Sequence, residues 1–275
     1  MYLQRWITGL AALPFLVALI YWGGTAFAVL IAGVSVVSLW EYFNILFANP
    51  GATERPRPPW GVIPILALFT APLMVWTAHR FSVELVVILL AGNLIFSSLY
   101  SFTRFDTDRR IVETGVKSIQ ALVYIPLMLS FAVLIRDGSD GMRWLFLVLA
   151  VVFAGDIGAL YAGTYLGKRK LCPSVSPGKT IEGSLGGLLA NVAVGVLFKL
   201  ILFPRLIWGE SILFFLILGI VGQIGDLYES EFKRAAGVKD SGAILPGHGG
   251  LLDRIDALLF ALPVAYFFIK FILWV

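Results

Sequence analysis

Long apolar runs, each ended by charged residues, proline or glycine, make up most of the sequence. We delimit nine of them, at 6–22, 24–47, 60–78, 83–101, 115–135, 144–165, 183–204, 209–228 and 252–274. Runs of about 20 residues match the hydrocarbon core of a bilayer when helical, and lipid offers no other partner to backbone amides. None of the runs alternates apolar and polar residues as barrel strands do. The chain is therefore predicted to be an all-α, polytopic membrane protein with about nine transmembrane helices.

The composition leaves no room for a separate soluble domain. Of the 275 residues, 59% are hydrophobic and 14% are charged, whereas soluble domains carry about 25% charged residues. Any chemistry must then be built from helix ends and short loops at the membrane boundary. We divide the chain into N-terminal transmembrane helices, 1–140, and a C-terminal catalytic half with its cytoplasmic loops, 141–275.

The distribution of Lys and Arg predicts the orientation. Six of the 21 basic residues fall on one side of the nine spans, namely Arg80, Arg136, Arg143, Lys199, Arg205 and Lys270, and the other fifteen share the side of the N-terminus. The richer side should be cytoplasmic. The same scatter over loops argues against a nucleic-acid partner. A signal peptide ending at Ala26-Phe27-Ala28 is a weaker alternative for the first run, because apolar sequence resumes at once.

Five acidic residues lie within or against the predicted spans, where an unpaired charge costs several kcal/mol. Asp226, Asp253 and Asp256 can share one depth at the cytoplasmic boundary, and their oxygens suit a hard cation such as Mg²⁺. The alternative is that nearby Arg or Lys residues neutralise them. Asp156 is equally compatible with a site role and with a buried bond to Tyr161 or a neighbouring helix. Glu41 is interpreted as an ordinary interfacial charge.

The cytoplasmic segment 168–187 joins basic residues to a glycine-rich helix start, Gly183–Gly187, which would present free amides to an anion. Ser176 and Lys179 are predicted to bind phosphate, whereas Lys168–Lys170 equally suit topology or anionic lipid. A P-loop is excluded, because its first glycine would fall on Pro173. Cys172 is the only cysteine, so no thiolate metal cluster is available.

A second cytoplasmic segment, 230–256, combines cations, glycines, an imidazole and carboxylates. Such a mixture is typical of a site where phosphates meet a divalent cation. His248, between glycines, is predicted to contact substrate or to move a proton. The remaining candidates for phosphate or transition-state contact are Lys233, Arg234, Lys239, Gly249, Gly250 and Arg254.

The segment 230–256 resembles the signature of the phosphatidate cytidylyltransferases, also called CDP-diacylglycerol synthases. Ser230, Lys233-Arg234, Lys239-Asp240, His248-Gly249-Gly250 and Asp253-Arg254-Ile255-Asp256 all stand at matching positions. The upstream segment 156–183 is similar to the family's second region, with Gly178 and Ile181 where Lys and Trp are more usual. The resemblance covers residues 150–260, and residues 1–140 match it only as apolar spans.

This resemblance implies cytidylyl transfer from CTP to phosphatidic acid, giving CDP-diacylglycerol and pyrophosphate, with Mg²⁺ required. The lipid phosphate is itself the nucleophile, so no nucleophilic Ser or Cys is expected. Lys239, His248, Arg254 and Asp156 would be catalytic, with Asp156 binding a second cation or the lipid headgroup. The expected location is the cell membrane, among lipids, with the N-terminus and site cytoplasmic, and homo-oligomerisation stays open.

Two rival classes use similar residues. The CDP-alcohol phosphotransferases end their motif much as 250–256 does, but the Asp-Gly-x-x-Ala-Arg start is missing. A secondary transporter could use intramembrane carboxylates and glycine-rich helix starts, but its usual internal repeat is absent, since the site residues all collect in the C-terminal half.

Overall fold

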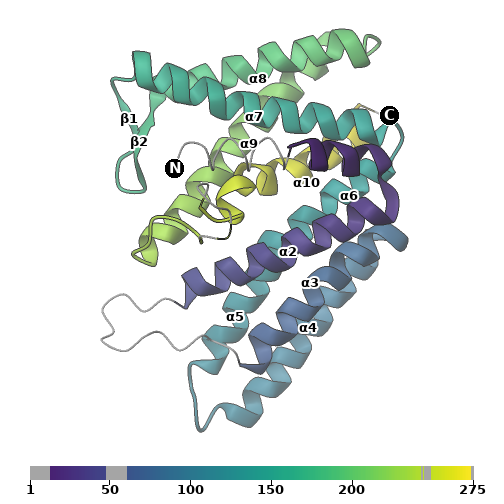
Figure 1. Ribbon diagram of the computed structural model, residues 1–275. Helices are drawn as coiled ribbons and strands as arrows, with labels where there is room; N and C mark the ends of the chain where they lie inside the picture. Colours follow the sequence, from purple (N-terminus) through teal and green to yellow (C-terminus); the bar gives the residue numbers. More distant parts are fainter. Residues whose placement is uncertain (1–12, 48–60, 243, 245–248, 274–275) are drawn as a thin grey trace. The chain divides into compact units, whose positions relative to one another are not determined.

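The computed structural model describes residues 13–47, 61–242, 244 and 249–273 (Figure 1). Its helices are Leu13–Trp22, α2 (Gly24–Leu46), α3 (Val62–Arg80), α4 (Val83–Arg104), α5 (Ile111–Leu122), α6 (Met128–Asp137), α7 (Gly141–Leu166), α8 (Ile181–Leu202), α9 (Trp208–Ala235) and α10 (Asp256–Phe271). A π-helical turn, η1 (Val123–Leu127), joins α5 to α6, and a 3-10 turn, η2 (Leu252–Arg254), precedes α10. The predicted all-α class is confirmed.

Seven helical segments of the described chain are long and apolar enough to cross a membrane, with α5, η1 and α6 counted as one. The predicted total of nine is therefore not confirmed. Leu13–Trp22 and α10, which has 16 residues, coincide with the two other predicted runs. Pro126 lies inside η1, where the wider turn accommodates its missing N–H.

Two short antiparallel strands interrupt the helical pattern between α7 and α8. They are β1 (Lys170–Cys172) and β2 (Ser176–Thr180), paired from Lys170 with Thr180 to Cys172 with Ser176. This hairpin was not predicted, because neither strand alternates apolar and polar residues over a useful length. Its position just before α8 places β2 along the start of that helix.

Contacts divide the chain into two units, one of residues up to Asp137 with Ala235–Arg254, and one of Gly138–Arg234 with the residues from Ile255. In the first unit α3 packs against α2, α4, α5 and α6, and Ile63, Ala67, Ala71 and Met74 of α3 are fully buried. The predicted division into N-terminal transmembrane helices, 1–140, and a catalytic half, 141–275, stays a prediction.

In the second unit, α7 and α8 lie side by side along most of their length (Figure 1). Glycines make this approach possible. A Cβ added to Gly158 would lie 2.5 Å from the Ala190 Cβ, and one added to Gly186 would lie 2.2 Å from the Ala162 Cβ. Small residues are the usual means of close helix packing in membranes, where lipid provides no hydrophobic drive.

Substituting Gly186 with Ala should therefore destabilise the second unit. The new methyl group overlaps Ala162, and overpacking of this kind costs about 1–3 kcal/mol. Gly92→Ala in α4 is the matched control, since a Cβ there meets nothing within 4 Å, and Ala is favoured over Gly in a helix by about 1 kcal/mol. Thermal unfolding in detergent measures both variants. A Gly186→Ala protein that melts at or above the wild-type temperature would contradict this account of the packing.

Candidate functional site

A pocket of about 460 Å³ opens within the second unit, among α7, the hairpin, α8 and α9. Polar side chains form part of its wall, from Asp156, Thr164, Ser176, Lys179, Thr180, Ser184, Gln223 and Asp226. Ala159, Leu160, Leu171 and Leu227 form an apolar part. A cavity with charged groups beside an apolar wall suits an amphipathic ligand whose head is ionic.

Local hydrogen bonds fix the hairpin against this pocket. The Glu182 carboxylate accepts the backbone N–H groups of Lys168 at 3.0 Å and Arg169 at 3.1 Å, and Arg234 Nε donates to the Val175 carbonyl at 3.2 Å. Arg234 thus supports the hairpin from the end of α9, a contact that its predicted phosphate role did not include. These bonds hold β2, with Ser176 and Lys179, along the pocket wall.

The start of α8 is capped from within the chain. Thr180 is the N-cap, and its Oγ1 accepts the Gly183 N–H at 3.0 Å. A Cβ added to Gly183 would lie 2.9 Å from the Ala159 carbonyl oxygen of α7. The prediction that Gly183 offers a free amide to an anion is therefore wrong, because its N–H already donates to the Thr180 hydroxyl. The lack of a side chain at Gly183 instead allows α8 to pack closely against α7.

Lys179 and Asp226 form an ion pair inside the pocket. Lys179 Nζ lies 2.6 Å from Asp226 Oδ2, without hydrogen-bond geometry, and both side chains are partly exposed to the cavity. Asp156 lines the same cavity and feels the charges of both residues. Tyr161, the alternative partner of Asp156, is 60% exposed and stacks on Tyr165. The structure thus brings together four predicted site residues, Asp156, Ser176, Lys179 and Asp226.

A polar pair in the pocket was missed at the sequence level. Ser184 Oγ donates to Gln223 Oε1, and Gln223 Nε2 donates to the Ser184 carbonyl at 3.0 Å. Gln223 lies in the apolar run 209–228, where an uncharged amide is rare enough to have been a usable signal. The pair joins α8 to α9 beside the ion pair, so it orders the pocket wall.

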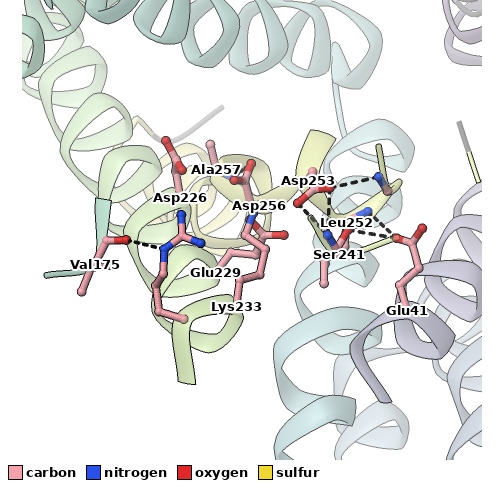
Figure 2. A network of polar contacts seen from close by, with 12 residues as sticks. Glu41, Val175, Asp226, Glu229, Lys233, Ser241, Leu252, Asp253, Asp256 and Ala257 are labelled. Atoms are coloured by element: carbon pink, nitrogen blue, oxygen red, sulfur yellow. Dashed lines mark hydrogen bonds and ion pairs between the residues drawn. The ribbon is translucent and has the colours of Figure 1, made fainter. Parts of the chain in front are cut away.

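The end of α9 and the start of α10 bring further candidates together in the second unit (Figure 2). Asp256 Oδ1 accepts a hydrogen bond from the Ala257 N–H at 2.8 Å. The Asp256 carboxylate interacts electrostatically with Asp226, Asp156 and Lys233. Lys233 Nζ is 2.5 Å from Glu229 Oε2, so an acid on its own helix neutralises it. A Cβ on Gly225 would lie 2.6 Å from the Asp256 carbonyl, which shows how closely α9 approaches α10.

The remaining candidates belong to the first unit, on the loop that precedes α10. Asp253 accepts the Ser241 N–H at 3.1 Å and the Gly250 N–H at 3.0 Å, so one carboxylate joins the two ends of the loop. Gly249 has φ of 83°, which a side chain would strain. Lys239 and Arg254 are exposed. His248 lies outside the described residues.

Glu41 of α2 is completely buried, at 0% exposure. Its carboxylate accepts hydrogen bonds from the same loop, from Ser241 and Leu252 (Figure 2) and from the Leu251 N–H. The prediction of an ordinary interfacial charge is therefore wrong. Its acidic character inside an apolar run was the available signal, but the partners, some 200 residues away, could not be identified from the sequence.

Mg²⁺ binds oxygen ligands, and carboxylates are the candidate ligands in this part of the molecule. No tight group of three or more His, Cys, Asp or Glu occurs among the described residues. Asp226, Asp256 and Asp156 of the second unit lie near enough to one another for their charges to interact. Mg²⁺ keeps several waters and takes one or two carboxylates together with substrate phosphates, so loosely arranged oxygen donors fit it.

Comparison with known proteins extends over nearly the whole chain. The model of the Cytidylyltransferase family matches residues 3–272 of the chain. A phosphatidate cytidylyltransferase of Bacillus subtilis is 34% identical over 271 residues, which cover 96% of each chain. The phosphatidate cytidylyltransferase of Staphylococcus haemolyticus is 34% identical over 265 residues, which cover 94% of this chain and 96% of that one. That of Staphylococcus epidermidis is 32% identical over 237 residues, which cover 86% of this chain and 90% of that one.

Proposed function

The chain belongs to the cytidylyltransferase family, and from this membership we propose that it transfers the cytidylyl group of CTP to phosphatidic acid in phospholipid biosynthesis. The products are CDP-diacylglycerol and pyrophosphate. A phosphate oxygen of the lipid attacks the α-phosphorus of CTP, the new P–O bond forms, and the bond between the α-phosphorus and the oxygen bridging to the β-phosphate breaks. Pyrophosphate leaves with that oxygen, so no covalent enzyme intermediate is needed.

The pocket of the second unit is the observation that carries this proposal. Lys179 can neutralise a phosphate, and Ser176 can donate a hydrogen bond to one, while Leu160, Leu171 and Leu227 offer apolar surface to the adjoining lipid. The ion pair with Asp226 balances the Lys179 ammonium. An incoming phosphate competes for that ammonium and leaves the Asp226 carboxylate available to a cation.

Mg²⁺ is the cofactor we propose, with Asp226 and Asp256 as its candidate ligands in the second unit and Asp253 as a candidate ligand in the first. Asp156 is available to a second cation or to the lipid headgroup. When bound, it would neutralise triphosphate charge and stabilise the leaving pyrophosphate. The Lys and Arg side chains of the chain would neutralise the charge of other phosphate oxygens. We assign the other phosphate contacts to Lys233, Arg234, Lys239, Arg254 and the backbone of Gly249 and Gly250, with His248 contacting substrate or moving a proton.

The orientation follows from the charge bias of the loops. The N-terminus and the site residues lie on the side richer in Lys and Arg, which we propose is cytoplasmic. CTP is a soluble polyanion and would reach the site from that side, while phosphatidic acid enters from the bilayer. The chain's apolar helices agree with a multi-pass location in the cell membrane.

Pyrophosphate release tests the activity directly. Purified protein in detergent should release pyrophosphate from CTP only when phosphatidic acid and Mg²⁺ are both present, because each is part of the reaction as proposed. Chelation of the metal should stop the release. A transporter would release none, since detergent leaves no sealed compartment and no bond is broken. Omission of phosphatidic acid with undiminished release would point to simple CTP hydrolysis and would reject the proposed acceptor.

A further inference from the structure

We propose that Glu41 is a positioning residue for the loop that precedes α10, defined here by its described residues, 239–242, 244 and 249–254. In this role Glu41 touches no substrate, but its carboxylate sets the backbone path of the loop that carries Lys239, Gly249, Gly250 and Arg254. The inference rests on the proposed function for its catalytic consequence, and on contacts within the first unit for its geometry.

The carboxylate of Glu41 is fully occupied by this loop. Oε1 accepts the Leu251 N–H at 3.1 Å, and Oε2 accepts the Leu252 N–H at 2.9 Å and lies 3.4 Å from the donor Ser241 Oγ. Within the described part of the chain, its hydrogen bonds come from these three residues alone. An acid buried in an apolar helix is costly without such partners, so the bonds account for its presence.

The loop approaches Glu41 so closely that two of its positions must be glycine. A Cβ added to Gly242 would lie 2.4 Å from Glu41 Oε1, and the three nearest atoms are all of the Glu41 side chain. A Cβ added to Gly250 would lie 2.9 Å from Glu41 Oε2 and closer still to Ser241 Oγ. The loop backbone is therefore shaped around this one carboxylate.

Glu41 and Asp253 act on the two ends of the same loop (Figure 2). The Asp253 carboxylate accepts hydrogen bonds from the N–H groups of Ser241 and Gly250. The Glu41 carboxylate accepts hydrogen bonds from the Ser241 hydroxyl and from the N–H groups of Leu251 and Leu252. Ser241 is the shared element, since its N–H goes to Asp253 and its hydroxyl to Glu41. Loss of Glu41 thus frees the loop from α2, and the catalytic groups on it lose their fixed positions.

Glu41→Ala and Glu41→Gln test this role. The Ala variant removes all three acceptors, and the isosteric Gln variant keeps one oxygen but turns an NH₂ group toward a backbone N–H. We expect kcat per folded molecule to fall about 100-fold in Glu41→Ala, as a small misplacement of catalytic groups can cause, and to fall less in Glu41→Gln. A merely structural role would lower the folded fraction and leave kcat per folded molecule unchanged. The control is Ser35→Ala, a buried position of α2 whose hydroxyl donates to the Ala32 carbonyl of its own helix.

Hydrogen exchange separates this inference from the proposed function. Peptides covering 239–254 should exchange faster in Glu41→Gln than in wild type, whereas peptides from α8 should not change, and neither result depends on the reaction catalysed. Wild-type exchange in the loop overturns the inference whatever the activity. Faster exchange in a protein that has no cytidylyl transfer even as wild type supports the positioning and rejects the function.

A double-mutant cycle gives a second, independent readout. Gly242→Ala should slow turnover, because its methyl group collides with the Glu41 carboxylate. In the Glu41→Ala background the collision is absent, so adding Gly242→Ala should cause no further loss. Additive losses in the double variant would overturn the proposed coupling.

Discussion

Replacing Asp226 with Asn is expected to abolish cytidylyl transfer, lowering kcat by about 1000-fold, the scale seen when a group that stabilises transition-state charge is removed. The substitution keeps the shape of the side chain but removes the negative charge that faces Lys179 at 2.6 Å. The variant therefore loses the proposed metal ligand and the charge that balances Lys179 together. Pyrophosphate release measures turnover, and thermal unfolding verifies that the variant is folded.

The control for Asp226→Asn is Asp140→Asn at the start of α7. Asp140 has φ of 49°, which Asn tolerates, and it pairs at 3.0 Å with the exposed Arg143 of its own helix start. The Asp140→Asn protein should release pyrophosphate at the wild-type rate. Raising Mg²⁺ should recover part of the Asp226→Asn activity if the carboxylate holds the cation. Full activity of Asp226→Asn at ordinary Mg²⁺ would reject both the metal assignment and the importance of the ion pair.

Asp253→Asn should also inactivate the enzyme, by about 100-fold or more, because catalytic groups displaced by a small distance lose their alignment. The Asp253 carboxylate takes N–H groups from Ser241 and Gly250, and an amide offers one acceptor and an unwanted donor in its place. The loss should appear in kcat and not only in the Mg²⁺ requirement. Asp106→Asn, on an exposed loop of the same predicted side, should have no effect.

Two measurements separate the possible contributions of Asp253. If it is chiefly a metal ligand, its Asn variant recovers at high Mg²⁺ and hydrogen exchange in 239–254 stays as in wild type. If it chiefly joins the ends of the loop, exchange rises there and added Mg²⁺ recovers nothing. An Asp253→Asn protein with wild-type turnover and wild-type exchange would remove the residue from both roles.

The helical architecture could be predicted because apolar length is a local property. A run such as 144–165 has to become a helix in lipid wherever it packs, and α7 covers it as Gly141–Leu166. The same holds for 183–204 and α8, Ile181–Leu202. The number of crossings was less well determined, since short helices such as α10 fall near the limit of length.

The candidate site was predictable where chemistry stands out against an apolar background. Asp156 and Asp226 are conspicuous in their spans, and the structure places both beside Lys179 and Ser176 in one pocket. Lys179 and Asp226 are distant in sequence, so no spacing rule could have paired them. Arg234 and Lys233 show the converse, because the contacts they make, to Val175 and Glu229, depend on side-chain geometry that composition does not encode.

Residue type and order alone therefore established the membrane class, the uneven distribution of basic residues and the family resemblance, since each depends on local composition or on a continuous motif. Long-range contacts decided the rest. The hairpin gains its place from Glu182 and Arg234, Gly183 serves packing because α7 lies against it, and Glu41 finds its partners only when α2 meets the loop before α10. A buried carboxylate must be satisfied, but which amides satisfy it is settled by the fold.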